Sequence, residues 1–486
     1  MNLEPRAARA TTSLPAEHLL LLVADGVRPD VLQEEIDAGQ VPAIAALARA
    51  GGMHSVSSSF PSVTGPAYVP FIMGRNPAAV GMPGLRWFDR GRTLRWAPGA
   101  ARSYAGVDIW HADGDVSHDA PTLFELARPS LAGMSMLGRG ASVANVGRSL
   151  LWSLRGAIAH FRGDMLGWRT IERAATAEFL RRFEHARPRL AVLALTSPDK
   201  FAHAYGSGSD AVRGAIRDVD AAIARAQQIA RDSDWFDRLR VWIVGDHGHA
   251  PVHEHDDLDG WLTSQGHRVL AHPRLGTRDA DIALMVGGNA MAHLYLHPAE
   301  RRRRWWHTHD TQWAQLHERL LMRDAIDLVA VGMDEHTMRV SHSARGSAEV
   351  HRTHTTRGER WDYIANGGDP LGFGGTLRGL DHTDAWTAAQ STPYPDSLVQ
   401  LSSLTASSRA GDLILSAAPG WDLRGRYEPV THVSTHGALL RDQMMVPLIV
   451  DAPPARQPMR TTDVVPSALA ALGIATTAQF DGRSFV

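Results

Sequence analysis

The sequence predicts an α/β fold in which a mostly parallel sheet lies between helix layers and carries an inserted cap. Three short apolar runs have the length and composition of buried parallel strands. These runs cover residues 19–23, 190–195 and 241–244. Asp25, Asp199 and Asp246 follow the three runs closely. In open α/β sheets the ligand site lies outside the carboxyl ends of the strands, so the three aspartates are predicted to meet at one edge of the sheet.

Helical patterns separate these strands, as expected of βαβ units. They predict helices over residues 171–184, 210–230 and 463–472. A shorter apolar stretch, residues 67–73, predicts a buried helix with Thr64 close to its N-cap. Residues 76–165 show no regular pattern, and no element is assigned to them.

The pattern changes between about residues 249 and 430, where short alternating pieces are typical of strands and hairpins. One such hairpin is predicted over residues 349–364. Core-like apolar runs return at residues 413–415 and 446–450. We therefore expect a catalytic core formed by residues 1–248 and 431–486, with residues 249–430 mainly as an inserted cap subdomain.

Composition excludes some classes of protein. The 486 residues are 44% hydrophobic and 21% charged, which is ordinary for a globular protein that buries a sizeable core. The formal net charge of −2 gives no reason to expect nucleic acid or an anionic membrane as a partner. The chain has no cysteine, which excludes disulfides, thiolate zinc sites and a cysteine nucleophile.

The amino-terminal residues do not resemble a signal peptide. Arg6 and Arg9 precede an apolar stretch, residues 19–24, that is shorter than a signal-peptide core and runs directly into Asp25. No run approaches the roughly 20 apolar residues of a membrane-spanning helix. These features predict a cytoplasmic protein without a transmembrane segment.

Carboxylate and imidazole side chains at the predicted strand ends form a candidate metal-ligand set. The set comprises Asp25, Asp199, His203, Asp246, His247 and His436. Asp199 and His203 are four residues apart and would share one face of a helix. Mixed oxygen and nitrogen ligands suit zinc or manganese better than calcium, and six ligands suit a pair of ions about 3.5–4 Å apart. Each residue alone is better explained as a turn or cap residue, but the joint pattern favours a metal centre.

Thr64 is the candidate nucleophile. Its hydroxyl would lie at a helix start, where free backbone amides favour an anion. A threonine hydroxyl is a weak nucleophile that metal coordination can activate. The alternative is a plain N-cap threonine.

These motifs together resemble the alkaline phosphatase superfamily, and within it the type I phosphodiesterase/nucleotide pyrophosphatase family. The resemblance rests on Asp25-Gly, Phe60-Pro-Ser-Val-Thr64, Asp199-x3-His203-x2-Gly206, Asp246-His-Gly248 and His436-Gly. Gly74, Pro77-x3-Gly81 and the carboxyl-terminal Arg460-Thr-Thr-Asp463 to Asp481-Gly-Arg483 segment extend it. It implies an alkaline-phosphatase-like core, but it does not cover the predicted cap.

The resemblance also implies roles for the candidate residues. One ion would be held by Asp199, His203 and His436, and the other by Asp25, Asp246 and His247. Thr64, bound to the second ion as an alkoxide, would attack phosphorus in line and form a phosphothreonine. The ions are expected to be zinc, with manganese as the alternative.

Two positions depart from the family pattern. An asparagine that contacts phosphate three residues after the nucleophile is replaced by Ala67, and Gly65-Pro66 stands where monoesterases carry an arginine. Lys200 is the only lysine of the chain and adjoins a predicted ligand. We expect its ammonium group to contact phosphate in place of the missing asparagine; the alternative is a solvated loop lysine.

The sequence therefore predicts a metal-dependent hydrolase of phosphoric esters, with small phosphodiesters of the nucleotide or lipid type as substrates. The same site could serve a phosphomonoesterase, a phosphonate hydrolase or a phosphotransferase. A protein of another class, a catalytically silent binder of phosphorylated ligands, remains an alternative that a full ligand set disfavours.

Two further clusters carry weaker expectations. His249, His253 and His255 follow the Asp246 loop and are expected to line the rim of the site or to be solvated. Asp256 and Asp257 share that expectation. The basic run at residues 301–304 is expected to be a solvated helix start rather than a nucleic-acid site.

Overall fold

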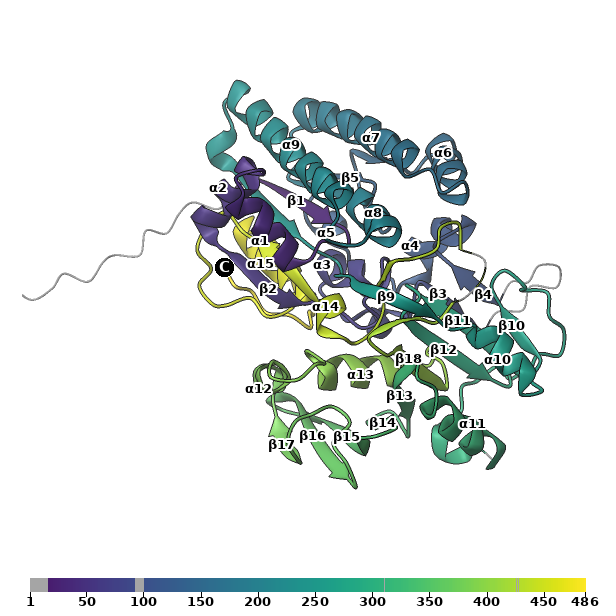
Figure 1. Cartoon of the computed structure of the whole chain (residues 1–486). Coiled ribbons are helices and arrows are strands. Elements are labelled where there is room, and N and C mark those ends of the chain that lie inside the picture. Colours follow the sequence, from purple (N-terminus) through teal and green to yellow (C-terminus); the bar gives the residue numbers. More distant parts are fainter. Residues whose placement is uncertain (1–15, 92–99, 310, 425, 427) are drawn as a thin grey trace, which may run out of the picture.

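The computed structural model describes residues 16–91, 100–309, 311–424, 426 and 428–486. Arg6 and Arg9, on which part of the signal-peptide argument depends, lie outside the described residues. Within them the chain forms two large sheets that lie side by side, and Figure 1 shows helices packed around each of them.

The first sheet has seven strands in the order β2-β21-β8-β1-β7-β5-β6 among the described residues. Its strands are β1 (His18–Ala24), β2 (Met53–Ser57), β5 (Ser130–Gly133), β6 (Ala144–Val146), β7 (Leu190–Leu195), β8 (Leu239–Val244) and β21 (Met445–Ile449). The run β8-β1-β7-β5-β6 is parallel, whereas β21 and β2 are antiparallel to their neighbours. The predicted α/β fold with a mostly parallel sheet is confirmed.

Alternation along β1 explains why this sheet is buried on both faces. Successive strand residues point to opposite faces. Leu19, Leu21 and Val23 lie in one hydrophobic cluster, and Leu20 and Leu22 lie in another on the opposite face. Both faces therefore need helices to cover them, as is usual for parallel sheets.

Helices from different parts of the chain cover the two faces. The face around Leu20 is covered by α1 (Pro29–Asp37), α2 (Pro42–Gly51), α7 (Met165–Ala186) and α9 (Asp210–Asp232). The opposite face is covered by α3 (Val69–Met73), α5 (Leu123–Leu126) and α15 (Val464–Ala471). The predicted helices over 171–184, 210–230 and 463–472 correspond to α7, α9 and α15. The remaining helices near this sheet are α6 (Leu150–Phe161) and α8 (Ser197–Tyr205).

The second sheet has nine strands in the order β10-β11-β12-β18-β13-β14-β15-β16-β17. They are β10 (Val269–Ala271), β11 (Ile282–Gly287), β12 (Met291–Leu296), β13 (Ile326–Gly332), β14 (Thr337–His342), β15 (Gly346–Thr355), β16 (Gly358–Asn366), β17 (Leu377–Leu380) and β18 (Leu413–Ala417). Its helices are α10 (Leu258–Ser264), α11 (Thr311–Leu321), α12 (His382–Ala389) and α13 (Ser397–Thr405). This material lies within the range expected for a cap, although the division into core and cap stays a prediction.

A small third sheet connects the loop after β8 with the segment before His436. It has the order β19-β9-β20, with β9 (Ala250–His255), β19 (Gly420–Asp422) and β20 (Ser434–Thr435). Ser434 pairs with Pro251 and Thr435 with Ala250. Because of this pairing, two segments almost two hundred residues apart enter the same edge of the first sheet.

Short elements complete the described chain. They are η1 (Pro66–Tyr68), η2 (Pro77–Val80), β3 (Arg86–Phe88), β4 (Ala101–Ser103), η3 (Val107–His111), α4 (Ala112–Asp115), η4 (Phe236–Arg238), η5 (Trp306–Thr308), α14 (Arg441–Met444) and η6 (Thr461–Asp463).

The structure corrects four local expectations. Residues 76–165 supply β5 and β6 to the first sheet, although no element was assigned there. The apolar run at 413–415 is β18, which lies in the middle of the second sheet and not in the first. The expected helix over 67–73 is divided into η1 and α3, and Thr64 does not cap it.

The basic run at 301–304 is the fourth correction, because α11 begins only at Thr311. Arg303 is buried, and its guanidinium donates to the carbonyl oxygens of Thr405 and Ser407.

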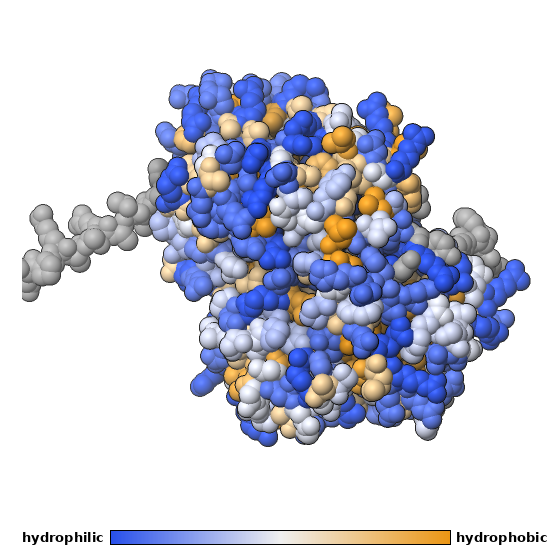
Figure 2. Space-filling model, viewed as in Figure 1, coloured by the Kyte–Doolittle hydropathy of each residue, from blue (hydrophilic) through white to orange (hydrophobic). Residues whose placement is uncertain are grey.

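The molecular surface is mostly hydrophilic on the face shown in Figure 2, where hydrophobic residues form small groups. Among the described helices, none is both long and apolar enough to cross a membrane.

Candidate metal centre

The three predicted aspartates meet at the carboxyl edge of the first sheet. β8, β1 and β7 are neighbours in this sheet. Asp25 follows β1 directly, Asp246 follows β8, and Asp199 lies in the first turn of α8 after β7. Their exposures are 0%, 0% and 4%, so three carboxylates are buried at one place.

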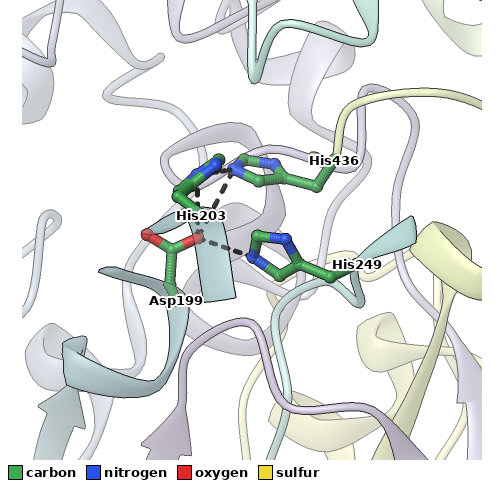
Figure 3. A group of neighbouring side chains, drawn as sticks. All are labelled: Asp199, His203, His249 and His436. Carbon is green, nitrogen blue, oxygen red and sulfur yellow. Dashed lines mark hydrogen bonds and ion pairs between the residues drawn. The ribbon is translucent and has the colours of Figure 1, made fainter. Parts of the chain in front are cut away.

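A first cluster is formed by one carboxylate and three imidazoles: Asp199, His203, His249 and His436. Figure 3 shows the three rings converging on the Asp199 carboxylate. The Nε2 atoms of His249, His203 and His436 lie 3.0, 3.3 and 3.5 Å from Asp199 Oδ1. The Nε2 atoms of His203 and His436 are 3.2 Å apart.

A second cluster contains Asp25, Asp246 and His247. The His247 Nε2 atom lies 3.5 Å from Asp25 Oδ1 and 3.4 Å from Asp246 Oδ2. Asp246 Oδ1 accepts from the backbone N–H of Gly26 at 3.1 Å, whereas its buried Oδ2 has no hydrogen-bond partner. Tyr68 donates to the other oxygen of Asp25 at 3.3 Å.

Thr64 adjoins the second cluster. Its Oγ1 atom lies 3.0 Å from His247 Nε2 and 3.4 Å from Asp25 Oδ1. Gly65, with a φ of 103°, turns the chain sharply after Thr64 and is the N-cap of η1. The hydroxyl therefore faces the ligand atoms, instead of capping a helix as the sequence suggested.

Backbone acceptors fix the orientation of three imidazole rings. The Nδ1 atoms of His203, His247 and His436 lie 2.9–3.1 Å from the carbonyl oxygens of Ser434, Gly248 and Ser62. A carbonyl oxygen can only accept, so each Nδ1 carries the hydrogen. In the neutral ring Nε2 then has a free lone pair, which is how histidine ligands are usually held.

Burial disfavours the charged forms of His203 and His436 and of the Asp25 carboxyl group. It lowers the pKa of His203 to about 3, assisted by the nearby His432. Burial also lowers the pKa of His436 well below its ordinary value, with His247 acting in the same direction. The pKa of Asp25 is raised well above its ordinary value by burial and by the charges of Asp246 and Asp199.

These features fit divalent cations. Lone pairs of neutral imidazoles and buried carboxylate oxygens converge in two adjacent clusters, and Asp246 Oδ2 is left without a donor. A buried acceptor without a donor is costly, and a cation between the ligands removes that cost. Imidazole with carboxylate suits zinc or manganese.

Lys200 lies at the border of the first cluster. Its Nζ atom is 3.9 Å from Asp199 Oδ2 and 5.4 Å from the centre of the Trp168 ring, and its side chain is 25% exposed. Its charge acts on Asp25 in the other cluster and lowers the pKa of that carboxyl group. Ala67, by contrast, is fully buried and offers no donor from its side chain.

His249 is the cluster member that the sequence did not identify. It was expected at the rim or in solvent, but it is completely buried against Asp199. Its neighbours in the sequence do lie outside the clusters: His253 is exposed, Asp256 pairs with Arg323, and the Asp257 side chain caps α10. The pairing of β9 with β20 brings His249 into the first cluster and leaves these neighbours outside it. No local sequence pattern predicts this pairing.

Gly26 offers a test of how closely these clusters are packed. A Cβ atom added there would lie 2.9 Å from Asp199 Cα and 3.0 Å from His249 Nε2. We predict that Gly26→Ala lowers zinc affinity by roughly 10- to 100-fold, because the added methyl group displaces Asp199 and His249. A loss of this size is usual when the groups that orient metal ligands are changed. Isothermal titration with zinc measures this change.

Gly39→Ala is the matched control, because Gly39 has a similar φ of 67° but no atom within 4 Å of an added Cβ. Both variants carry the same backbone strain. Equal zinc affinities for the two variants would contradict the crowding argument.

Comparisons with known proteins identify the family and the fold. The family model of type I phosphodiesterase/nucleotide pyrophosphatase matches residues 19–439. No curated protein matches the chain. Phosphonoacetate hydrolase from Sinorhizobium meliloti 1021 shares 16% identity at a TM-score of 0.55, covering 94% of this chain and 96% of that one.

Human ectonucleotide pyrophosphatase/phosphodiesterase 5 shares 15% identity at a TM-score of 0.58, covering 96% of this chain and 97% of that one. Its murine counterpart, solved in complex with AMP, shares 13% identity at a TM-score of 0.56 over 96% and 98%. At these identities the neighbours establish an alkaline-phosphatase-like fold. The match to the family model covers most of the sequence, and the chain therefore belongs to the type I phosphodiesterase/nucleotide pyrophosphatase family of phosphate-ester hydrolases.

Proposed function

We propose that the chain is a two-metal phosphodiesterase that uses Thr64 as its nucleophile. The observation that carries the proposal is the Thr64 hydroxyl, which lies 3.0 Å from His247 Nε2 and 3.4 Å from Asp25 Oδ1, inside the second cluster. In this position the Thr64 oxygen could share an ion with the Asp25, Asp246 and His247 ligand atoms.

Two ions are assigned to the two clusters. The first ion is held by Asp199, His203 and His436, and the second ion by Asp25, Asp246 and His247 with the Thr64 oxygen. Zinc is the proposed metal, because neutral imidazole and carboxylate are its common ligands. When bound, such a pair supplies positive charge that lowers the pKa of a hydroxyl group and stabilises charge on phosphate oxygens.

The chemistry assigned to the chain's own residues has two steps. In the first, the Thr64 oxygen forms a bond to phosphorus, the bond to one ester oxygen breaks, and that alcohol leaves with a proton. In the second, water attacks phosphorus and releases Thr64. Tyr68 and the N–H of Gly26 hold the Asp25 and Asp246 carboxylates in place through both steps.

Turnover of nitrophenyl substrates tests this proposal. We predict that the zinc-loaded protein prefers a bis-nitrophenyl phosphodiester over nitrophenyl phosphate. Thr64→Ala should lower kcat by roughly 1000-fold or more, because removal of a nucleophile abolishes its chemistry. Thr64→Ser keeps the hydroxyl and should retain measurable turnover.

Three outcomes would change the assignment. Preference for the monoester would favour a phosphatase, and full activity of Thr64→Ala would exclude Thr64 as nucleophile. Two bound ions without turnover of either ester would favour a strictly selective enzyme or a silent binder. Metal content per chain separates the last case from loss of metal.

Lys200 is proposed as the phosphate contact that compensates for Ala67. A hydrogen bond to a charged group contributes about 1.5–3 kcal/mol, so Lys200→Ala should lower kcat/KM by roughly 10- to 100-fold. Lys200→Arg keeps the charge and should recover part of the loss. Metal content should be the same in both variants, since the Lys200 ammonium group cannot act as a ligand.

One result would exclude this role for Lys200. Turnover of the best diester by Lys200→Ala at the rate of the unaltered protein would show that Lys200 does not contact substrate.

A further inference from the structure

We propose that His249 is a fourth protein ligand of the first ion, so that three imidazoles and one carboxylate surround it. The inference rests on the proposed two-metal function. It departs from the ligand set that the sequence motifs imply, in which Asp199, His203 and His436 hold this ion alone.

The distances within the cluster fit a single ion. Zinc binds imidazole nitrogen and carboxylate oxygen at about 2.0–2.2 Å, so two ligands of a tetrahedron are roughly 3.3–3.6 Å apart. The three Nε2 atoms lie 3.0–3.5 Å from Asp199 Oδ1. His249 is the nearest of the three, and its contact is of the same kind as those of the two motif histidines.

Ser434 determines which nitrogen of His249 carries the hydrogen. The Ser434 hydroxyl donates its one hydrogen to the carbonyl oxygen of Ala250 at 3.1 Å. Its oxygen therefore accepts from His249 Nδ1, which lies 3.1 Å away. The free lone pair of His249 is then on Nε2, the atom that faces Asp199.

In this tautomer a neutral His249 ring has no hydrogen on Nε2 to donate to Asp199. The Nε2 lone pair and the carboxylate oxygen are both acceptors, and they repel each other at 3.0 Å unless a cation lies between them. A ligand role removes the conflict, because both atoms then bind the same ion. His249 is also fully buried.

Four protein ligands would change the behaviour of the first ion. Catalytic zinc sites commonly have three protein ligands and an open position, whereas four ligands close the tetrahedron. A substrate oxygen that reaches this ion then enters as a fifth ligand. The first ion should also be held more tightly than a three-ligand site allows.

Metal titration and cobalt spectroscopy test the assignment. Zinc is titrated into metal-free protein, and cobalt(II) is used to report the ligand geometry by its visible absorption. We predict that His249→Ala lowers the affinity of one ion by roughly 100-fold or more and changes the cobalt spectrum. His253→Ala, at an exposed histidine of the following strand β9, should leave both unchanged.

His249→Met keeps the volume of the buried side chain and serves if the alanine variant fails to fold. Affinity and cobalt spectrum equal to those of the unaltered protein in a folded His249 variant would overturn this inference alone. Fewer than two ions bound by the unaltered protein would overturn the proposed function together with it.

A second, independent observation concerns the exposed surface of α6. Among the described residues, eleven large hydrophobic side chains are exposed, and six of them lie between positions 150 and 166. Five are on α6 itself: Leu150, Leu151, Leu154, Ile158 and Phe161, with exposures of 78%, 56%, 56%, 47% and 69%. The only fully buried residue of this helix is Ala159.

The five side chains share one face of the helix. Their spacing of one, four, eight and eleven residues from Leu150 places them within about 100° of arc at 3.6 residues per turn. An apolar face of this kind in water marks a binding surface. The exposed Leu166, at the start of α7, follows it.

The charged residues beside this apolar face of α6 indicate what kind of surface it binds. Arg155 and Arg162 are exposed at its edge, and α6 contains no acidic residue. A helix with Leu and Phe on one side and arginines beside them is typical of helices that lie on anionic lipid surfaces. We infer that α6 docks the protein on such a surface, a local feature that the net charge of −2 conceals.

The position of α6 relates this surface to the metal centre. Its opposite side carries His160, whose pKa is lowered to about 3 by burial and by the charge of Lys200. A Cβ atom on Gly163, just after α6, would lie 3.0 Å from Val430, in the segment that leads to His436. Docking through α6 would therefore hold the centre close to the lipid surface.

Sedimentation with vesicles tests the docking. We predict that the protein sediments with phosphatidylcholine vesicles that contain phosphatidylserine, and less with phosphatidylcholine alone. The double change Leu154→Asp and Phe161→Asp should abolish binding, and Arg155→Glu with Arg162→Glu should weaken it. Met322→Asp, which alters an equally exposed side chain elsewhere, should have no effect.

Two results would overturn the lipid assignment. One is absence of the unaltered protein from the vesicle pellet. The other is a dimer, measured by light scattering, that the Leu154→Asp and Phe161→Asp changes convert to monomer, because a second copy would then cover this face.

Discussion

The candidate metal centre depends on the burial of three carboxylates at one edge of a parallel sheet. Asp25, Asp199 and Asp246 are almost inaccessible to water, and their mutual repulsion together with burial raises the pKa of Asp25 well above its ordinary value. Burying like charges is costly unless an opposite charge compensates them. The surrounding histidines cannot supply that charge, because burial lowers the pKa values of His203 and His436. Lys200 supplies one positive charge at the border of the site. Metal cations would compensate the remaining negative charge, and the free lone pairs of the same histidines are suited to bind them.

The strands and loops around the site hold the three buried carboxylates and the histidines in place. Three neighbouring strands, β8, β1 and β7, end side by side and fix the aspartates. The histidines are held from the other side, by carbonyl groups of Ser62, Gly248 and Ser434 that accept from their Nδ1 atoms. Ser434 supports two rings at once, His203 through its carbonyl and His249 through its hydroxyl. The close approach of Gly26 to Asp199 leaves no space for a side chain between the ends of β1 and β7.

Much of the metal-ligand set could be predicted from the sequence, because its residues follow recognisable strands or share one helix face. Short apolar runs followed by Asp25, Asp199 and Asp246 predict adjacent strand ends, and the spacing of Asp199 and His203 predicts one helix face, which α8 provides. What sequence could not supply depends on distant pairing. His249 enters the cluster because β9 pairs with β20, a contact that no local pattern encodes. β5 and β6 were missed because they are only four and three residues long. Thr64 was expected to cap a helix, but the turn at Gly65 directs its hydroxyl to His247.

Rapid acid quench of the zinc-loaded protein during turnover of a phosphodiester, followed by peptide mass spectrometry, tests the central claim most directly. A double displacement predicts a peptide in which Thr64 carries the phosphate of the substrate, still esterified to its second alcohol, and that adduct should be absent from Thr64→Ala. Turnover without any adduct on Thr64, accompanied by inversion of configuration at phosphorus, would show a single attack by water and contradict the account.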